Sequence, residues 1–283
     1  MITKNAGKGE SGTQVTFSTI NESDCCFERI PKDHSVLFLD FDGTLAPIQE
    51  KPDSVFLTPG KLSLLKALSK KMPVFILSGR SLADLQLRLP LDELAGASGD
   101  HGASRIYKGK RFADPEGDSA RTSMQALFEL LHPALAKWPD VSTEKKEYSL
   151  SVHYRQLRED KRKDFSEFLE DRFRHTGVDN LEMRHGKCVF EFRHPRISKE
   201  SALLWFLHRL DSVKDQDETG DRTYYPIMIG DDTTDLNAIK TAITLGGKGI
   251  WVGEQLPDDN PPLPSLLKNT EQVWEWLENT FMG

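Results

Sequence analysis

The chain has 283 residues, of which 37% are hydrophobic and 29% are charged, and its formal net charge is −7. This composition is ordinary for a soluble globular protein, and at roughly 150 residues per domain the length suggests about two domains. The acidic balance argues against sequence-independent nucleic-acid binding, which depends on Lys and Arg side chains that contact phosphates.

The cysteine content and the hydropathy pattern indicate the cellular setting. Three cysteines, two of them adjacent, do not suggest a disulfide framework. The sequence contains no run of about 18 apolar residues, so it predicts no membrane span. Residues 1–24 also lack the apolar stretch of a signal peptide. We therefore expect a cytoplasmic protein with no membrane partner, and residues 1–30 are expected to form a flexible N-terminal arm.

Short apolar runs alternate with helix-spaced leucines in the N-terminal part of the chain. Such runs predict strands that are covered on both faces, and Thr58 followed by Pro59 predicts the start of the first helix. The alternating order predicts a parallel sheet with right-handed crossovers. The predicted strands are 36–39, 72–78 and 94–102, and the predicted helices are 58–71 and 81–89.

The pattern changes after about residue 105. Residues 148–154 alternate strictly between apolar and polar side chains, which is typical of a one-sided strand in an antiparallel sheet. Amphipathic helices are predicted over 119–138 and 161–174. Residues 180–195 are expected to form two strands joined at His185-Gly186. This segment is therefore predicted to be a separate α/β module.

The first pattern resumes after residue 195. Ser198 is a predicted helix cap, and an apolar run over 224–230 ends in a group of acids. We predict an α/β fold in which a Rossmann-like parallel-sheet core domain, residues 31–105 and 195–283, carries the inserted module 106–194. The remaining predicted elements are helices over 198–210, 236–245 and 270–281 and a strand over 248–253.

Polar clusters end or closely follow four predicted strands. In an open parallel sheet, ligands bind outside the carboxyl ends of the strands, so neighbouring strands would bring these clusters to one rim. Three or more carboxylates there would repel one another. A hard divalent cation removes that repulsion, and oxygen-only ligands suit Mg²⁺. The clusters are DFDGT (40–44), SGR (78–80), GDHG (99–102) and GDDTTD (230–235).

These segments resemble a known family. DFDGTL, SGR, SKESA and GDDTTD look like the four ordered signatures of the haloacid dehalogenase-like phosphatases. Within that superfamily, LFLDFDGTLAPI, ILSGR, GDHGA, SLSVHYR, GKCVFEFRHP and IGDDTTD are similar to the trehalose-6-phosphate phosphatases. The resemblance spans residues 37–235. It implies that module 106–194 is a cap that determines substrate specificity.

The resemblance also implies catalytic roles. Asp40 would be the nucleophile that forms an aspartyl-phosphate, and Asp42 would act first as general acid and then as general base. Lys199 would balance the charge between Asp40 and the phosphate. The implied Mg²⁺ ligands are Asp40, Asp42 through its backbone carbonyl, and Asp231, while Asp232 and Asp235 are either secondary ligands or residues that hold the loop.

Further residues are implied to contact the substrate. Ser78 would bind the phosphoryl oxygens, and Thr44, Gly79 and Arg80 belong to the same phosphate-binding set, although Arg80 is alternatively a surface charge. The implied sugar contacts are His101, Arg155, Lys187 and Glu191. His101 alone is alternatively structural, and Lys187 with Glu191 is alternatively a surface ion pair.

The predicted function is a Mg²⁺-dependent phosphatase that hydrolyses trehalose 6-phosphate, with a small-molecule sugar phosphate as its partner and a monomer as its state. The alternatives are a phosphatase of another sugar phosphate, of sucrose or mannosyl type, and a catalytically silent phosphosugar-binding module. Two positions depart from the family pattern: Leu236 stands where a Glu is expected, and Glu200 follows Lys199 where a Gly is expected.

Overall fold

The computed structural model describes residues 30–49, 51–186, 188–212, 224–257 and 261–283. The expected N-terminal arm therefore lies almost entirely outside the described residues. The strands are β1 (Ser35–Leu39), β2 (Val74–Leu77), β3 (Gly96–Gly99), β4 (Ser104–Tyr107), β5 (Lys110–Ala113), β6 (Ser142–Lys145), β7 (Ser149–His153), β8 (Glu182–Gly186), β9 (Val189–Arg193), β10 (Tyr225–Gly230), β11 (Lys248–Val252) and β12 (Ser265–Leu267). The helices are α1 (Pro59–Ser69), α2 (Leu82–Arg88), α3 (Gly117–Leu135), α4 (Glu159–Arg174), α5 (Lys199–Asp211), α6 (Thr233–Thr244) and α7 (Thr270–Phe281), with short 3₁₀ turns η2 (Lys32–His34), η3 (Pro52–Ser54) and η4 (Asp100–Gly102).

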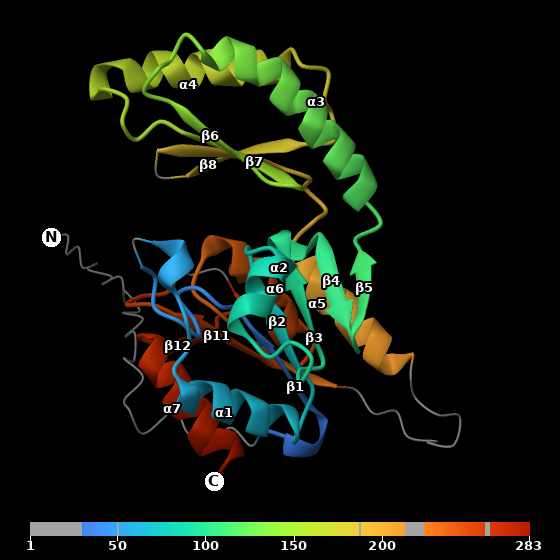
Figure 1. Ribbon diagram of the computed structural model, residues 1–283. Coiled ribbons are helices and arrows are strands. Elements are labelled where there is room, and N and C mark those ends of the chain that lie inside the picture. The colour runs from blue at the N-terminus through green and yellow to red at the C-terminus, as the bar shows by residue number, and fades with distance from the viewer. Residues whose placement is uncertain (1–29, 50, 187, 213–223, 258–260) are drawn as a thin grey trace, which may run out of the picture. The chain divides into compact units, whose positions relative to one another are not determined.

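A large sheet of eight strands has the order β12-β11-β10-β1-β2-β3-β4-β5 (Figure 1). The strands from β12 to β3 are parallel, whereas β4 and β5 pair antiparallel at one edge. Leu37 in the central strand pairs with Ile227 on one side and Val74 on the other. All residues of β1 and β2 are buried, as their continuous apolar sequence predicts. The central strands are therefore held rigidly on both faces and both edges.

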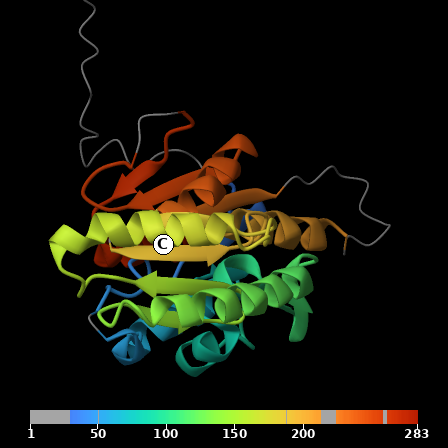
Figure 2. The same cartoon turned by 90° about the horizontal axis from the view of Figure 1, so that it is seen from above.

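A smaller antiparallel sheet has the order β6-β7-β9-β8. Helices α3 and α4 run side by side on one of its faces (Figures 1 and 2). In β7 the apolar Leu150 and Val152 are fully buried, whereas Ser151 and His153 are partly exposed, as the predicted alternation requires. Ser149 at the start of the strand is an exception, because it is buried. The chain is thus an α/β protein in which this module is inserted into a Rossmann-like sheet.

Two features of the sheets differ from the prediction. Strands β4 and β5 belong to the large sheet, so the expected start of the module at residue 106 is wrong and lies inside β4. Lys108 and Gly109, both with positive φ, form a tight hairpin turn between β4 and β5 and return the chain to the sheet. The second difference concerns the hairpin at His185-Gly186: both residues lie within β8, where Gly186 pairs with Val189, so the chain reverses after them.

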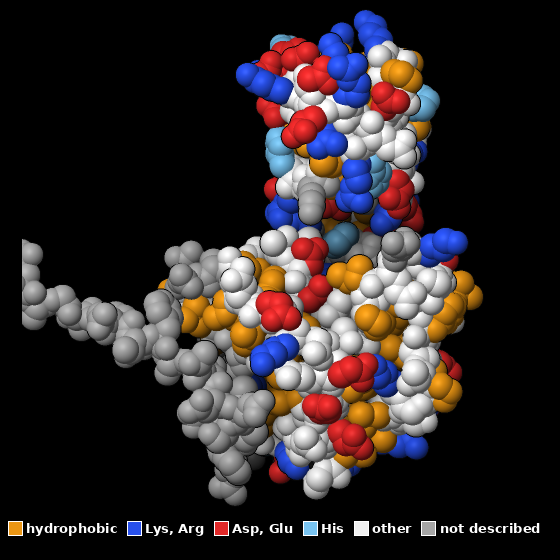
Figure 3. Space-filling view, turned by 90° about the vertical axis from the view of Figure 1, so that its left-hand side faces the viewer, with side chains coloured by type: hydrophobic (Ala, Val, Ile, Leu, Met, Phe, Trp, Pro, Cys, Tyr) orange, Lys and Arg blue, Asp and Glu red, His pale blue; other side chains and the backbone are white. Residues whose placement is uncertain are grey.

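The surface carries charges of both signs. On the face shown in Figure 3, Lys and Arg side chains lie among Asp and Glu side chains, and no broad basic area covers that face. Among the described residues, none of the helices combines the length and the apolar character that a membrane span requires.

A buried ion pair holds the edge of the large sheet. Arg105 on β4 is 1% exposed and donates to the carboxylate of Asp114, which directly follows β5. Its Nε also donates to the carbonyl of Gly102 at 3.1 Å. Because both charges are buried, each depends on the other for compensation.

We expect Arg105→Met to lower the free energy of unfolding by about 3–5 kcal/mol, because it leaves the buried Asp114 carboxylate without its partner. Urea unfolding measures the change. As a control, Arg158→Met breaks an exposed pair with Asp160 and should cost less than about 1 kcal/mol. Replacing both partners, Arg105→Met with Asp114→Leu, should restore most of the loss. Equal losses in Arg105→Met and in the control would contradict the assignment.

Candidate active site

The carboxyl ends of four neighbouring strands carry the polar clusters predicted from the sequence. The amide of Asp40 donates to Ile229 O at 3.0 Å, and that of Ser78 donates to Ser98 O at 2.9 Å. Each bond continues the parallel ladder one residue past the strand. The sheet therefore sets the backbone position of both residues, at the edge where α/β proteins bind ligands.

Three carboxylates converge at this edge around one ammonium group. Asp40, Asp231 and Asp235 each place one oxygen within 4.8 Å of the others. The Nζ atom of Lys199 donates to Asp40 Oδ1 at 2.6 Å and to Asp235 Oδ1 at 2.7 Å. Lys199 and Asp40 are each 3% exposed, and Asp235 is fully buried. Ser198 caps helix α5, as predicted, and so fixes Lys199 at the first helical position.

The electrostatics of the cluster follow from burial. Burial alone lowers the pKa of Lys199, but the Asp235 and Asp40 carboxylates outweigh it and raise that pKa above its ordinary value. Burial, followed by the charge of Asp40, raises the pKa of Asp231, and burial likewise raises the pKa of Asp235. With all groups ionised, three carboxylates and one ammonium leave a charge of −3 + 1 = −2. This excess of carboxylate groups over ammonium groups fits a hard divalent cation.

The loop after β1 is shaped by its contact with Asp231. Gly43 has φ +83°, and a Cβ atom there would lie 2.0 Å from Asp231 Oδ2. Both the backbone conformation and the space therefore require glycine. Thr44 is fully buried, and its hydroxyl donates to Asp231 Oδ1 at 3.2 Å. Thr44 thus orients an acid of the cluster.

Asp42 points to a different partner from Asp40. Arg80 donates from Nε to Asp42 Oδ2 at 2.6 Å and from Nη2 to Oδ1 at 2.7 Å. Its third nitrogen, Nη1, donates to Asp84 Oδ2 at 2.7 Å. The pKa of Arg80 is raised, and the hydrogen bond to Asp42 is the largest cause of this rise. The guanidinium, predicted to bind phosphate or to be a surface charge, is here engaged by two carboxylates.

A cleft of about 790 Å³ opens beside these groups. It is lined by the three predicted catalytic residues, Asp40, Asp42 and Lys199, and by Ser78, Gly79, Arg80, His101 and Asp232 from the other predicted sets. A Cβ atom on Gly79 would lie 2.5 Å from Cε1 of His101, so the imidazole depends on this glycine for space. The structure thus brings most of the predicted residues to one cavity.

Of the predicted sugar contacts in the described part of the chain, only His101 lines the cleft. Glu191 does not line the cleft, but its Oε1 lies 3.8 Å from His101 Nε2. Arg155 is exposed after β7 and does not line the cleft. Lys187 lies outside the described residues. The Asp232 side chain caps helix α6, which begins at Thr233 and not at Leu236 as predicted, and Asp235 completes the capping box.

Comparisons with known proteins decide the family. The model of the trehalose-phosphatase family matches residues 38–252. The chain belongs to the trehalose-phosphatase family.

Individual relatives and structures agree with this assignment. The chain is 31% identical to the trehalose-phosphate phosphatase of Mycobacterium bovis over 247 residues, which cover 82% of this chain and 56% of that protein. It therefore spans little more than half of that relative. It is 35% identical to a probable trehalose-phosphate phosphatase of Sinorhizobium fredii, over 80% of each chain. The C-terminal domain of Candida albicans trehalose-6-phosphate phosphatase has the same fold, with a TM-score of 0.70 at 19% identity over 88% of this chain and 93% of that one.

The two departures from the family pattern have structural partners. Glu200 accepts a hydrogen bond from the Thr241 hydroxyl at 2.6 Å and so ties α5 to α6. Leu236 is partly buried and packs against the apolar core between the sheet and these helices. Neither residue lines the cleft.

Several residues that line the cleft were not predicted from the sequence. Asp84 follows Arg80 by four positions and precedes Arg88 by four, a helical spacing at which charged side chains meet. That signal was present in the sequence. Asp53 also lines the cleft, as do Glu144, Lys146 and Glu147 from the inserted module. No local pattern marks these last residues, because only the packing of the module brings them to the cleft.

The imidazole of His101 is held in its neutral form. Its Nδ1 has no hydrogen-bond partner among the described residues. Burial is the main cause that lowers the pKa of His101 to about 3, and nearby cations add to it. The charged groups that act on it are Lys199, Arg193, Lys146 and Arg184, with Glu191 opposite Nε2.

We expect this burial to make the wild type more sensitive to acid than a His101→Asn variant. Below pH 6.5 the unfolded chain binds a proton at His101 that the folded chain does not, so stability falls as the pH falls. Between pH 7.5 and 5.0 the wild type should lose up to about 2 kcal/mol more than the variant. Asn is chosen because residue 101 has φ +56°, a region that Asn tolerates. Urea unfolding at both pH values measures this, and parallel pH dependences would contradict it.

Proposed function

We propose that this protein is a Mg²⁺-dependent phosphatase that hydrolyses trehalose 6-phosphate to trehalose and phosphate. The observation that carries the proposal is the buried Asp40 carboxylate, bonded to Lys199 and facing a cleft, in a chain of the trehalose-phosphatase family. The names of the relatives supply the substrate.

In the first step, a carboxylate oxygen of Asp40 attacks phosphorus and the bond from phosphorus to the sugar oxygen breaks. Because Lys199 binds Oδ1 of Asp40, we assign the attack to Oδ2. Asp42 in its acid form gives its proton to the departing sugar oxygen, which is a poor leaving group without it. The ammonium of Lys199 and the hydroxyl of Ser78 stabilise the negative charge of the phosphoryl group.

In the second step, water attacks the aspartyl-phosphate and Asp42, now ionised, takes the proton from that water. Phosphate leaves and the carboxylate of Asp40 is regenerated. The two carboxyl groups are two residues apart, yet they have different partners, Lys199 and Arg80. This difference in environment supports giving them different roles.

Mg²⁺ would be held by the carboxylates of Asp40 and Asp231 and by the backbone carbonyl of Asp42. When bound, it would supply positive charge to the acids and to the phosphate. The raised pKa of Asp231 supports this assignment, because it reflects a carboxylate whose charge is poorly compensated by the protein alone. Asp235 is bonded to Lys199 and to the Asp232 amide, and we assign it to holding the loop.

The inserted module, from α3 to β9, would act as the cap that recognises the sugar. His101 from the core and Glu191 from β9 lie close together, and both offer hydrogen-bonding groups that suit sugar hydroxyls. Closure over the substrate would exclude water from the reaction. The exposed position of Arg155 gives it no contact with this cleft in the present arrangement.

Phosphate release from a panel of sugar phosphates tests the function. Trehalose 6-phosphate should be preferred over sucrose- and mannosyl-type phosphates by at least roughly tenfold in kcat/KM, or about 1.4 kcal/mol. Removal of divalent cations with a chelator should abolish release, and added Mg²⁺ should restore it. A different best substrate would move the assignment to another sugar-phosphate phosphatase. Tight binding without release would indicate a binding module.

Asp40→Asn should lower kcat by at least about a thousandfold, because the amide cannot form the phosphoenzyme, while the substrate still binds. Rapid-quench assays measure turnover, and calorimetry measures substrate affinity. Asp33→Asn makes the same charge change at an exposed residue before β1 and should leave both unchanged. Substantial turnover by Asp40→Asn would remove Asp40 from the nucleophile role.

A further inference from the structure

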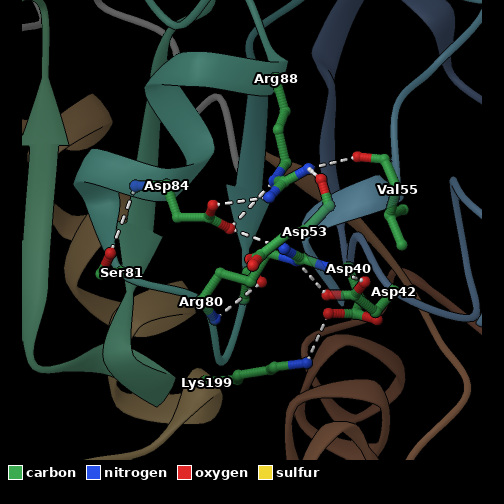
Figure 4. A network of polar contacts seen from close by, with 10 residues as sticks. Asp40, Asp42, Asp53, Val55, Arg80, Ser81, Asp84, Arg88 and Lys199 are labelled. Carbon is green, nitrogen blue, oxygen red and sulfur yellow. Dashed lines mark hydrogen bonds and ion pairs between the residues drawn. The ribbon is translucent and has the colours of Figure 1, made fainter. Parts of the chain in front are cut away.

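Asp42 is the last residue in a series of connected ion pairs. Asp42 lies on a loop and its side chain is 35% exposed, so the loop by itself leaves the carboxylate free to rotate. Arg80 donates one hydrogen bond to each of the two carboxylate oxygens (Figure 4). Such a fork fixes orientation as well as distance.

Arg80 is itself held by Asp84. The Nη1 atom of Arg80 donates to Asp84 Oδ2 at 2.7 Å. The amide of Asp84 donates to the Ser81 hydroxyl, which caps α2, so the backbone that carries Asp84 is fixed by the first turn of that helix. Asp84 therefore keeps the guanidinium in place independently of Asp42.

Arg88 also donates hydrogen bonds to the carboxylate of Asp84. Its Nε and Nη2 donate to Asp84 Oδ2 and Oδ1 at 3.0 and 2.7 Å. Its Nη1 donates to the carbonyls of Val55 at 2.5 Å and Asp53 at 3.2 Å. The Arg88 side chain is only 3% exposed. Figure 4 shows the resulting line from Arg88 through Asp84 and Arg80 to Asp42.

Placing an arginine on the buried face of a short helix requires the desolvation of its charge, which costs free energy. Leu82 and Leu85 fill the same face of α2 with apolar side chains. Replacing buried ion pairs by well-packed apolar residues is often neutral or stabilising, so stability alone does not account for Arg88. A buried, fully directed set of bonds does, however, fix the position of the group at its end.

We propose that Asp84 and Arg88 are positioning residues that hold Arg80 and, through it, the carboxyl group of Asp42. This inference rests on the proposed function, because that function gives Asp42 its role in proton transfer. Neither residue touches the reacting atoms. Their effect is on the orientation of the group that delivers the proton to the sugar oxygen.

The test compares leaving groups in Asp84→Asn, a variant of nearly the same shape. A sugar oxygen needs a proton to leave, whereas 4-nitrophenolate leaves without one. Asp84→Asn should therefore lower kcat for the sugar phosphate by at least about tenfold, with KM changed less than about threefold. The burst of 4-nitrophenolate, which reports formation of the phosphoenzyme, should change by less than about threefold.

Matched variants separate positioning from stability. Asp92→Asn makes the same charge change at an exposed residue just after α2 and should leave both rates unchanged. Arg88→Lys keeps the charge but not the fork, and should show the same dependence on the leaving group. Thermal unfolding of each variant shows that the protein assayed is folded.

A double-mutant cycle tests whether Asp84 acts through Asp42. In an Asp42→Asn background, single-turnover hydrolysis of the sugar phosphate should fall less than about twofold when Asp84→Asn is added. A further tenfold fall in the Asp42→Asn background would overturn the inference, as would equal losses for both leaving groups in Asp84→Asn alone. The network would then serve only to tie residues 53–55 to α2. A wild type that hydrolyses no phosphate ester would instead overturn the proposed function and this inference with it.

Discussion

The buried ammonium of Lys199 is the contact on which the arrangement of the site depends. It bonds Asp40 and Asp235, which are 159 and 36 residues away along the chain, and so joins α5 to the ends of β1 and the start of α6. A charge buried this deeply must be compensated, which forces the three segments together. One ammonium does not compensate three acids, and the remaining negative charge explains why the site suits a divalent cation.

The same constraint separates two acids that are neighbours in sequence. Asp40 is buried and paired with Lys199, whereas Asp42 is partly exposed and paired with Arg80. The first environment fits the nucleophile role proposed for Asp40. The second leaves the Asp42 carboxylate open to the cleft, which its proposed role in proton transfer requires. The ion pairs of Arg80, Asp84 and Arg88 then connect Asp42 to α2 and to the loop before α1.

The large sheet and the inserted module contribute different groups to the cleft. The large sheet carries the acids, and proteins with very different sequences share it, so the likeness to solved structures speaks only for the fold. The inserted module contributes Glu191 beside His101, and Lys146 with its acidic neighbours at the cleft. Under the proposed function, the module would recognise the sugar while the sheet carries the reacting groups.

The sequence alone determined the buried strands β1, β2 and β10, the caps at Thr58 and Ser198, and the order of the motifs, because each depends on residues within a few positions of one another. It did not determine β4, β5, β6 or β12, which are short strands held by pairing with their neighbours. Only the tertiary structure decided that Arg80 faces Asp42, that Arg155 stays exposed and that Arg88 reaches Val55. These contacts join side chains that are distant in sequence, and the packing of helices and loops on the sheet selects them.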